Sequence, residues 1–334
     1  MMVTRVFSGI QPTGTLHLGN YFGAVRNWSL MQQDIECFIC IVDYHAITID
    51  VEPQALRRAS IDMALDLLAC GIDPEKTLLF VQSDVPEHTE LSWILGCVTS
   101  FGDLSRMTQF KDKSEKQAFV STGLFTYPVL QAADILIYKA DGVPVGEDQV
   151  QHLELSRRIA RRFNSRFGET FPEPVPVVPE KGARIMSLSN PEIKMSKSAG
   201  EAHFIGMMEP EVGVRKKIRS AVTDMGLETG EAMSPGVANL FEILELSSAI
   251  TGEEHLVSEL HEEFRAGVLM YSKLKDTVFE QTMSVLRPIQ ERRAKLEASG
   301  DVLDILQTCA TKARSIAQHT MAEVRKRVGL GIEM

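Results

Sequence analysis

Two polar segments within the first 200 residues carry side chains suited to bind phosphate. The first reads FSGIQPTGTLHLGN, where Pro12 and the glycines predict a tight turn from a strand into a helix. The free N–H groups at the start of that helix suit a phosphate, and His17 and Asn20 add side-chain donors, with Gln11 within reach of a sugar or phosphate oxygen. The spacing matches neither the dinucleotide-binding glycine pattern nor the P-loop, which excludes those two kinds of nucleotide site.

The second segment reads ARIMSLSNPEIKMSKSAG and places Lys194 and Lys197 with Ser196 and Ser198 in a polar loop. Two lysines three residues apart are ordinarily a solvated surface. Combined with a phosphate-binding helix start, they are suited to stabilise the charge that develops on a transferred or leaving phosphate. The two segments together favour phosphoryl or nucleotidyl chemistry.

The elements that must position these segments follow an α/β pattern, because short β-rich runs alternate with amphipathic helical stretches. The strands are expected at Val3–Phe7, Glu36–Val42, Thr77–Val81 and Val143–Val145, and the helices at Asn20–Gln33, Pro53–Cys70, Glu87–Thr99 and Gly123–Tyr138. Such a series predicts a Rossmann-like parallel sheet with ligands outside the carboxyl ends of the strands. The stretch 172–182 is rich in Pro and Gly and interrupts the pattern, and the chain is almost purely helical in period after Gly200. We therefore expect a catalytic domain over 1–200, with the lysine loop at its end, and a helical domain over 201–334.

Composition narrows the class of protein. The chain has 334 residues, 44% hydrophobic and 24% charged, which is ordinary for a globular protein and excludes collagen-like or wholly disordered chains. The longest apolar run, Cys37–Val42, is far shorter than the ~20 residues that span a bilayer, and the opening residues do not resemble a signal peptide. A net charge of −10 argues against a general nucleic-acid coat and against DNA binding, although a local basic face could still bind RNA. The five scattered cysteines predict a reduced, cytoplasmic protein, and Cys37 and Cys40 are expected in a buried strand rather than at a metal.

Two motifs at the ends of this region, PTGTLHLGN and KMSKS, resemble the two signatures of the class I aminoacyl-tRNA synthetases. Between them stand VDYHAIT, SRMTQFKDKS, YPVLQAADILIY and GVPVGEDQ, in that order. Taken together, these segments resemble the bacterial tryptophanyl-tRNA synthetases, from Phe7 to the C-terminal helices.

The resemblance implies an ATP site. In the family, ATP is held at Gln11, Pro12, Thr13, Gly19 and Asn20, its ribose at Gly146, Glu147 and Asp148, its adenine between Ile185 and Met195, and its triphosphate at Lys113, Lys194, Ser196, Lys197 and Ser198. The catalytic group would be Lys194, Lys197 and Lys113, with His17 and Asn20 on the phosphates near the helix start. Mg²⁺ would come with the triphosphate, and no metal site of the protein's own is expected.

The resemblance also implies a tryptophan site. Indole only donates a hydrogen bond, and Asp134 would accept it. Phe7, Val42, His45 and Val145 would line the slot, and Tyr127 and Gln149 would hold the amino group of the substrate. Gln131 stands where many members have a methionine, and Tyr127, Gln131 and Asp134 also fit the Y-x-x-x-Q-x-x-D pattern of tyrosyl-tRNA synthetases. Against tyrosine, Phe7 and Gln11 replace a tyrosine and an aspartate of those enzymes, which favours tryptophan.

The implied reaction is activation of L-tryptophan by ATP, followed by transfer to tRNA(Trp). A homodimer and anticodon recognition by the helical domain come with the family. Three alternatives stay open at this point: a tyrosine-specific synthetase, another nucleotidyltransferase that shares the H-x-G-N turn, and an RNA-binding relative that has lost catalysis.

Overall fold

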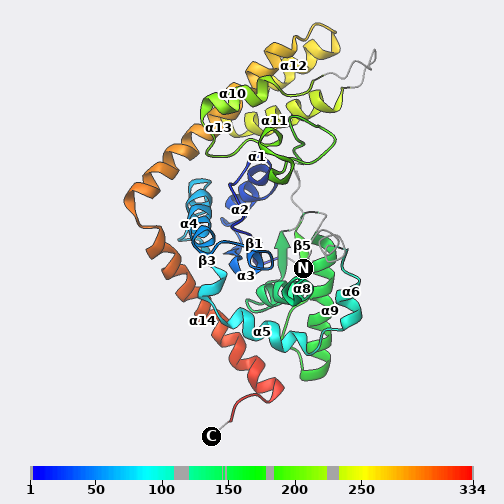
Figure 1. The fold of residues 1–334 in the computed structure, drawn as a ribbon, viewed down its shortest axis with the longest axis vertical. Helices are drawn as coiled ribbons and strands as arrows, with labels where there is room; N and C mark the ends of the chain where they lie inside the picture. Colours follow the sequence, from blue (N-terminus) through cyan, green and yellow to red (C-terminus); the bar gives the residue numbers. More distant parts are fainter. Residues whose placement is uncertain are drawn as a thin grey trace.

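A parallel β-sheet of five strands lies among helices in the computed structural model, which describes residues 3–108, 120–144, 146, 149–177, 184–223 and 233–332 (Figure 1). The strands are β1 (Arg5–Ile10), β2 (Glu36–Ile41), β3 (Thr77–Val81), β4 (Gly142–Pro144) and β5 (Val175–Val177), in the order β3-β2-β1-β4-β5. The chain moves outward from β1 to β3 and then crosses to β4 on the other side of β1. The carboxyl ends of β1 and β4 therefore flank the point where a doubly wound sheet binds its ligands.

Strand β2 shows why its sequence reads as a continuous apolar run. Its residues after Glu36 are buried, because helices cover both faces of the sheet. Phe38 and Cys40 join one hydrophobic cluster, whereas Ile39 and Ile41 join the other. Residues three apart on a strand point to opposite faces, so Cys37 and Cys40 do not form a shared site, in agreement with the prediction of a buried strand.

The helices of the first 200 residues largely follow the predicted pattern. Those before β4 are α1 (Leu18–Asn20), a π-helical turn η1 (Tyr21–Val25), α2 (Arg26–Met31), α3 (Asp43–Ala46), α4 (Pro53–Ala69), η2 (Gln82–Asp84), α5 (Glu87–Gly96), α6 (Phe101–Ser105) and α8 (Thr122–Leu136). After β4 come α9 (Val150–Phe167) and the short turns η4 (Lys197–Ala199) and η5 (Glu201–His203). Helix α4 begins as its sequence predicts, with Pro53 at the first helical position and the carboxylate of Glu52 accepting from the N–H of Ala55.

Two strand assignments from the sequence need correction. Strand β1 continues past Phe7 to Ile10, and β4 begins at Gly142 rather than at Val143. Strand β5 lies inside the Pro- and Gly-rich stretch, which we expected only to interrupt the pattern. A proline is tolerated there because β5 is an edge strand, where one N–H direction needs no partner.

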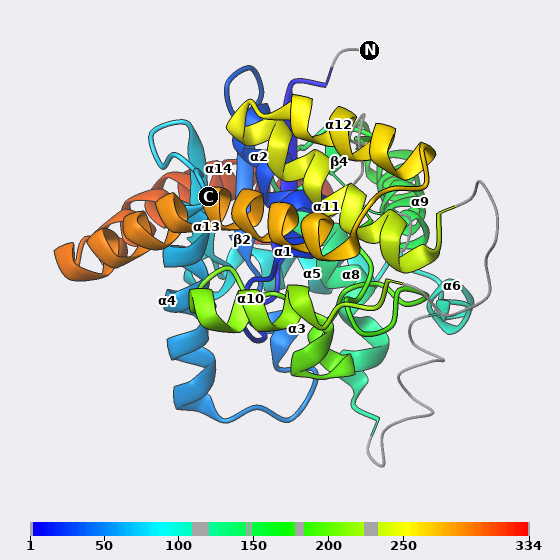
Figure 2. The ribbon, with the colours of Figure 1, turned by 90° about the horizontal axis from the view of Figure 1, so that it is seen from above.

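The C-terminal third is helical, as predicted, and consists of α10 (Glu211–Arg219), α11 (Pro235–Thr251), α12 (Glu254–Arg265), α13 (Tyr271–Ser299) and α14 (Val302–Val328). Helices α10–α13 gather at one end of the long axis, seen from above in Figure 2. After Gly300 the chain turns, and α14 runs on to the opposite end of the long axis and packs on β3 and α5 (Figure 1). Small residues such as Ala313 and Ala317 let α14 approach the core closely. The fold class is thereby confirmed, whereas the boundary at residue 200 stays a prediction. No helix in these described ranges is both long and apolar enough to span a membrane.

Candidate active site

The turn after β1 carries the first group of predicted site residues. His17 is the N-cap of α1: its Nδ1 accepts from the N–H of Asn20 at 3.2 Å, and the Oδ1 of Asn20 accepts from the N–H of His17 at 3.3 Å. This reciprocal capping box fixes the start of the helix. The turn is also held from the C-terminal half, because the N–H of Leu18 donates to the carbonyl of Ile205 at 2.8 Å. The helix start is therefore preorganised for an anion.

The protonation state of His17 follows from its surroundings. Burial, with the charges of Lys197 and Lys194 adding to it, lowers the pKa of His17 from 6.5 to about 4. The ring is therefore neutral at neutral pH, and since Nδ1 accepts a hydrogen bond, the proton is on Nε2. The capping box leaves the Nε2–H of His17 and the amide nitrogen of Asn20 as donors toward a ligand. One atom of each side chain is thus already used on the other residue.

The lysine loop lies directly beside this turn. Its two ends pair as a short antiparallel bridge, with the N–H of Met195 donating to the carbonyl of Ile185 at 3.0 Å. The side chains of Ile185 and Met195 are each only 1% exposed, in one hydrophobic cluster with Leu16 and Leu18. They lie close to the turn after β1, and in this conformation their side chains present no open surface to an adenine.

Lys197 reaches across to the turn after β1. Its Nζ donates to the carbonyl of Thr13 at 3.2 Å, and a Cβ added at Gly14 would lie 2.9 Å from that nitrogen. Gly14 also has a φ of 76°, so both its conformation and the lysine above it favour glycine. Burial lowers the pKa of Lys197 from 10.5 to about 8, although the carboxylate of Asp66 acts in the opposite direction. Lys194 is exposed on the same loop.

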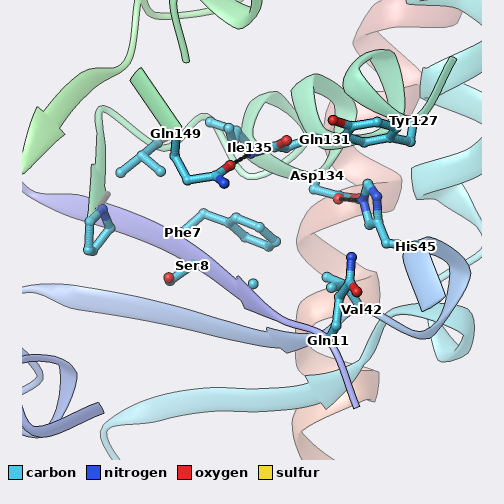
Figure 3. Close-up of a pocket in the computed structure, with 13 residues that line it drawn as sticks. Phe7, Ser8, Gln11, Val42, His45, Tyr127, Gln131, Asp134, Ile135 and Gln149 are labelled. Atoms are coloured by element: carbon cyan, nitrogen blue, oxygen red, sulfur yellow. Dashed lines mark hydrogen bonds and ion pairs between the residues drawn. The ribbon is translucent and has the colours of Figure 1, made fainter. Parts of the chain in front are cut away.

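A cavity of about 340 Å³ opens at the carboxyl ends of β1 and β4 (Figure 3). Its size is that of a small-molecule site. Seven of the predicted amino-acid-binding residues line it, together with Gln11 from the turn: Phe7, Val42, His45, Tyr127, Gln131, Asp134 and Gln149. Gly9 lets β1 approach its neighbour, since a Cβ there would lie 3.0 Å from the Cγ1 of Val42.

Asp134 is a buried carboxylate at the wall of this cavity, 1% exposed, on α8. His45 Nε2 lies 2.8 Å from its Oδ2, while His88 Nδ1 and Gln82 Nε2 lie 2.6 and 2.7 Å from its Oδ1. Burial alone would raise the pKa of Asp134, but hydrogen bonds from His45 and His88 outweigh it and hold the pKa at about 2. The carboxylate is therefore ionised and acts only as an acceptor.

Polar side chains line the rest of the cavity. The hydroxyl of Tyr127 lies 2.7 Å from Nε2 of His152, and burial raises the pKa of Tyr127 to about 12, so the phenol stays neutral. The amide of Gln131 donates to Oε1 of Gln149 at 3.3 Å (Figure 3). The cavity thus combines apolar walls, one buried anion and a set of neutral polar groups.

Four of the predicted site residues are not described by the structure. Lys113, Val145, Glu147 and Asp148 lie outside the described residues. Gly146 is described and exposed after β4. The sequence did not indicate the remaining lining residues, which are Ser8, Gly9, Ile135, Val143 and Pro144, or the two partners of Asp134, Gln82 and His88. These lining residues are close in sequence to predicted ones on the same strands and helix, and that proximity is the only feature of the sequence that could have indicated them.

The comparisons with known proteins agree with this geometry. The family model described as tRNA synthetases class I (W and Y) matches residues 2–287. The tryptophan–tRNA ligase of Wolinella succinogenes is 48% identical over 333 residues, which cover 99% of this chain and 100% of that protein. The crystal structure of tryptophanyl-tRNA synthetase from Mycoplasma pneumoniae has a TM-score of 0.88 at 37% identity and covers 99% of each chain. The Campylobacter jejuni enzyme in complex with ADP and tryptophan has a TM-score of 0.85 at 37% identity, over 98% of this chain and 100% of that one. The chain belongs to the bacterial tryptophanyl-tRNA synthetases, within the class I tRNA synthetases.

Proposed function

We propose that this chain activates L-tryptophan with ATP and then transfers the tryptophanyl group to tRNA(Trp). The observation that carries this proposal is the ionised, buried Asp134 at the wall of an apolar cavity that opens beside the lysine-covered phosphate turn. The membership of the family supports it, as does the relative that was crystallised with ADP and tryptophan.

Asp134 would recognise the indole by its one remaining acceptor position. A carboxylate offers about four lone-pair positions. Two on Oδ1 are taken by His88 and Gln82, and one on Oδ2 is taken by His45. The position left on Oδ2 suits a single N–H donor, and indole is such a donor with an otherwise apolar surface. Phe7, Val42 and Ile135 supply the apolar walls, and Tyr127 and Gln149 the polar partners of the amino group.

Tyrosine fits this arrangement less well. A phenol hydroxyl both donates and accepts, and Asp134 can only accept from it. The donor of His45 that lies nearest, Nε2–H, is already used on Asp134. Phe7 offers no polar group where a second phenol contact would be needed, and an unmet hydrogen bond to a substrate hydroxyl forfeits much of the affinity for it. The cavity therefore favours tryptophan over the tyrosine alternative.

The activation step needs positioning and charge stabilisation rather than a covalent enzyme intermediate. An oxygen of the tryptophan carboxylate attacks the α-phosphorus of ATP, the bond from that phosphorus to the bridging oxygen breaks, and its electron pair leaves with pyrophosphate. Lys197 and Lys194, joined by Lys113, would stabilise the leaving pyrophosphate, and His17 and Asn20 would bind the phosphates. Ser196 and Ser198 would assist them from the same loop.

ATP would enter as its Mg²⁺ complex. Among the described residues no group of three or more His, Cys, Asp or Glu side chains is placed to hold a metal ion. Mg²⁺ commonly keeps its waters and binds through the phosphates of the substrate, which matches a site built from lysines and backbone N–H groups. The ribose would lie at Gly146, Glu147 and Asp148, beyond the carboxyl end of β4.

In the second step, a hydroxyl of the terminal ribose of tRNA attacks the carbonyl carbon of the adenylate. The bond from that carbon to the phosphate oxygen breaks, AMP leaves, and the hydroxyl proton is released. The helical C-terminal region would read the anticodon. Because tRNA is charged where translation takes place, we assign the enzyme to the cytoplasm.

We also propose that the chain works as a homodimer. Trp93 on α5 and Phe101 on α6 are 78% and 75% exposed, which is unusual for large aromatic side chains. Phe101 contacts Phe125 of α8, with ring centroids 5.1 Å apart, and Phe125 packs against the hydrophobic core of the catalytic region. We expect Trp93→Glu to shift the protein from dimer to monomer in sedimentation equilibrium, whereas an unchanged mass would contradict this interface.

The experiment that tests the function is charging of tRNA. Purified protein, ATP and Mg²⁺ are mixed with labelled tryptophan and tRNA(Trp), and acid-precipitable label is measured. We expect label on intact tRNA(Trp) and none on tRNA whose terminal ribose has been oxidised with periodate. Failure to label intact tRNA, with the protein shown to be folded, would overturn the proposal.

A further inference from the structure

A buried hydrogen-bond chain lies behind Asp134, on residues that do not line the cavity. His88 at the start of α5 places Nδ1 2.6 Å from Oδ1 of Asp134 and Nε2 2.7 Å from the hydroxyl of Tyr138. Tyr138 follows the end of α8 and, like His88, is 0% exposed. Hydrogen bonds therefore link Tyr138 to His88 and His88 to Asp134, and the first two of these side chains have no contact with solvent.

The direction of every proton in this chain is fixed by its two ends. Asp134 is ionised and can only accept, so Nδ1 of His88 carries a proton and donates it. Burial raises the pKa of Tyr138 well above its ordinary value, so its hydroxyl keeps its proton. Within the described residues that hydroxyl has no second hydrogen-bond partner, so it donates to Nε2 of His88. Both ends thus require the same tautomer of His88, with its proton on Nδ1, and their two hydrogen bonds fix the orientation of the ring.

The same chain sets which oxygen of Asp134 faces the cavity. His88 and Gln82 both approach Oδ1, which fills the lone pairs of that oxygen and fixes the plane of the carboxylate. The open position is therefore on Oδ2, beside His45. Tyr138 also supports the opposite wall, because its ring stacks on Phe7 with centroids 5.8 Å apart and planes 10° apart. Tyr138 thus supports two walls of the proposed indole site: Asp134 through His88, and Phe7 by direct stacking.

We propose that Tyr138 and His88 are positioning residues for tryptophan specificity: the hydroxyl of Tyr138 holds the ring of His88 in the orientation that keeps Asp134 aligned to accept the indole N–H. This inference rests on the proposed function. Without the hydroxyl, Nε2 of His88 loses its donor, and the ring is held only by its bond from Nδ1 to Asp134. The ring could then turn and take Asp134 with it, and the acceptor position for indole would be lost, while the ATP site would be unaffected.

The test compares two substrates that differ only at the donor. Amino-acid-dependent exchange of pyrophosphate into ATP is measured with tryptophan and with β-(3-benzothienyl)alanine, in which sulfur replaces the indole N–H. In Tyr138→Phe we expect KM for tryptophan to rise about tenfold, the scale of one hydrogen bond to a charged group, with kcat and the KM for ATP within about twofold. KM for the sulfur analogue should not change, because it has no N–H to present. Tyr271→Phe, which removes a hydroxyl at the start of α13, is the matched control and should leave both substrates unchanged.

A second variant separates positioning from folding. Asparagine places a side-chain N–H close to that of histidine Nδ1 and has no ring nitrogen that needs a donor from residue 138. We therefore expect the double variant His88→Asn, Tyr138→Phe to regain most of the preference for tryptophan over the analogue. Equal losses for both substrates in Tyr138→Phe, or no loss for tryptophan, would overturn the positioning role. Absence of tryptophan-dependent exchange in the wild-type protein would instead refute the proposed function itself.

Discussion

Lys197 is placed so that the rate of activation should depend on pH above neutrality. Burial brings the pKa of its ammonium from 10.5 down to about 8, so half of the molecules carry the charge at that pH. At pH 9 only about one in ten keeps it, against about nine in ten at pH 7. If the charged form stabilises the leaving pyrophosphate, kcat/KM for ATP should fall about tenfold between pH 7 and pH 9. This parameter is the correct one, because it reports the pKa values of the free enzyme.

The assay is pyrophosphate exchange at saturating tryptophan, with ATP varied at each pH. Lys197→Arg keeps its charge over the whole range, so any activity it retains should lose the alkaline decline. Lys197→Ala should lower kcat about a hundred- to a thousandfold, as for removal of one transition-state donor, with no change in the affinity for tryptophan measured by equilibrium dialysis. An alkaline decline that persists in both variants would show that another group titrates, and a parallel loss of tryptophan affinity in Lys197→Ala would refute the assignment to the pyrophosphate.

Three further outcomes are expected. Arg293 of α13 donates to the buried carboxylate of Asp66 at 2.8 Å, so Arg293→Leu should lower the free energy of unfolding in urea by about 3–5 kcal/mol, whereas Arg287→Leu, which breaks an exposed pair on the same helix, should cost at most about 1 kcal/mol. His17 has its pKa lowered from 6.5 to about 4, so the unfolded chain binds the extra proton first and stability is lost as the pH falls through this window. At pH 5 this loss is about 2 kcal/mol relative to pH 7, and His17→Asn, which keeps the cap but cannot titrate, should flatten that part of the stability profile. Asp134→Asn should raise KM for tryptophan far more than KM for ATP in the exchange assay, since the amide presents N–H groups to donors.

The positions of the site residues were predictable where the chemistry is local. The capping pair His17 and Asn20 lies three residues apart, and the two lysines lie on one loop, so spacing alone brought each set together. Residues such as Phe7 and Val42 could be placed because the carboxyl ends of parallel strands meet at one edge of the sheet. The resemblance then supplied the proposed roles, including that of Asp134, which lines the cavity.

The partners of Asp134 could not be predicted in the same way. Gln82, His88 and His45 lie 46 to 89 residues from it along the chain, and no helical or strand period links them. His88 reads as an ordinary polar residue in the first turn of a helix, and only the packing of α5 against α8 brings it to the carboxylate. Strand β5 was missed for a different reason: it is three residues long and contains a proline, so its pairing with β4 depends on tertiary context.

The most direct test of the central claim is the amino-acid dependence of activation. Exchange of labelled pyrophosphate into ATP needs only the purified protein, Mg²⁺ and the amino acid, and it reports adenylate formation without tRNA. The arrangement around Asp134 predicts exchange with tryptophan and none above background with tyrosine at the same concentration. Exchange with tyrosine that equals or exceeds that with tryptophan would show that Gln131 and Asp134 form a phenol site and would contradict the account.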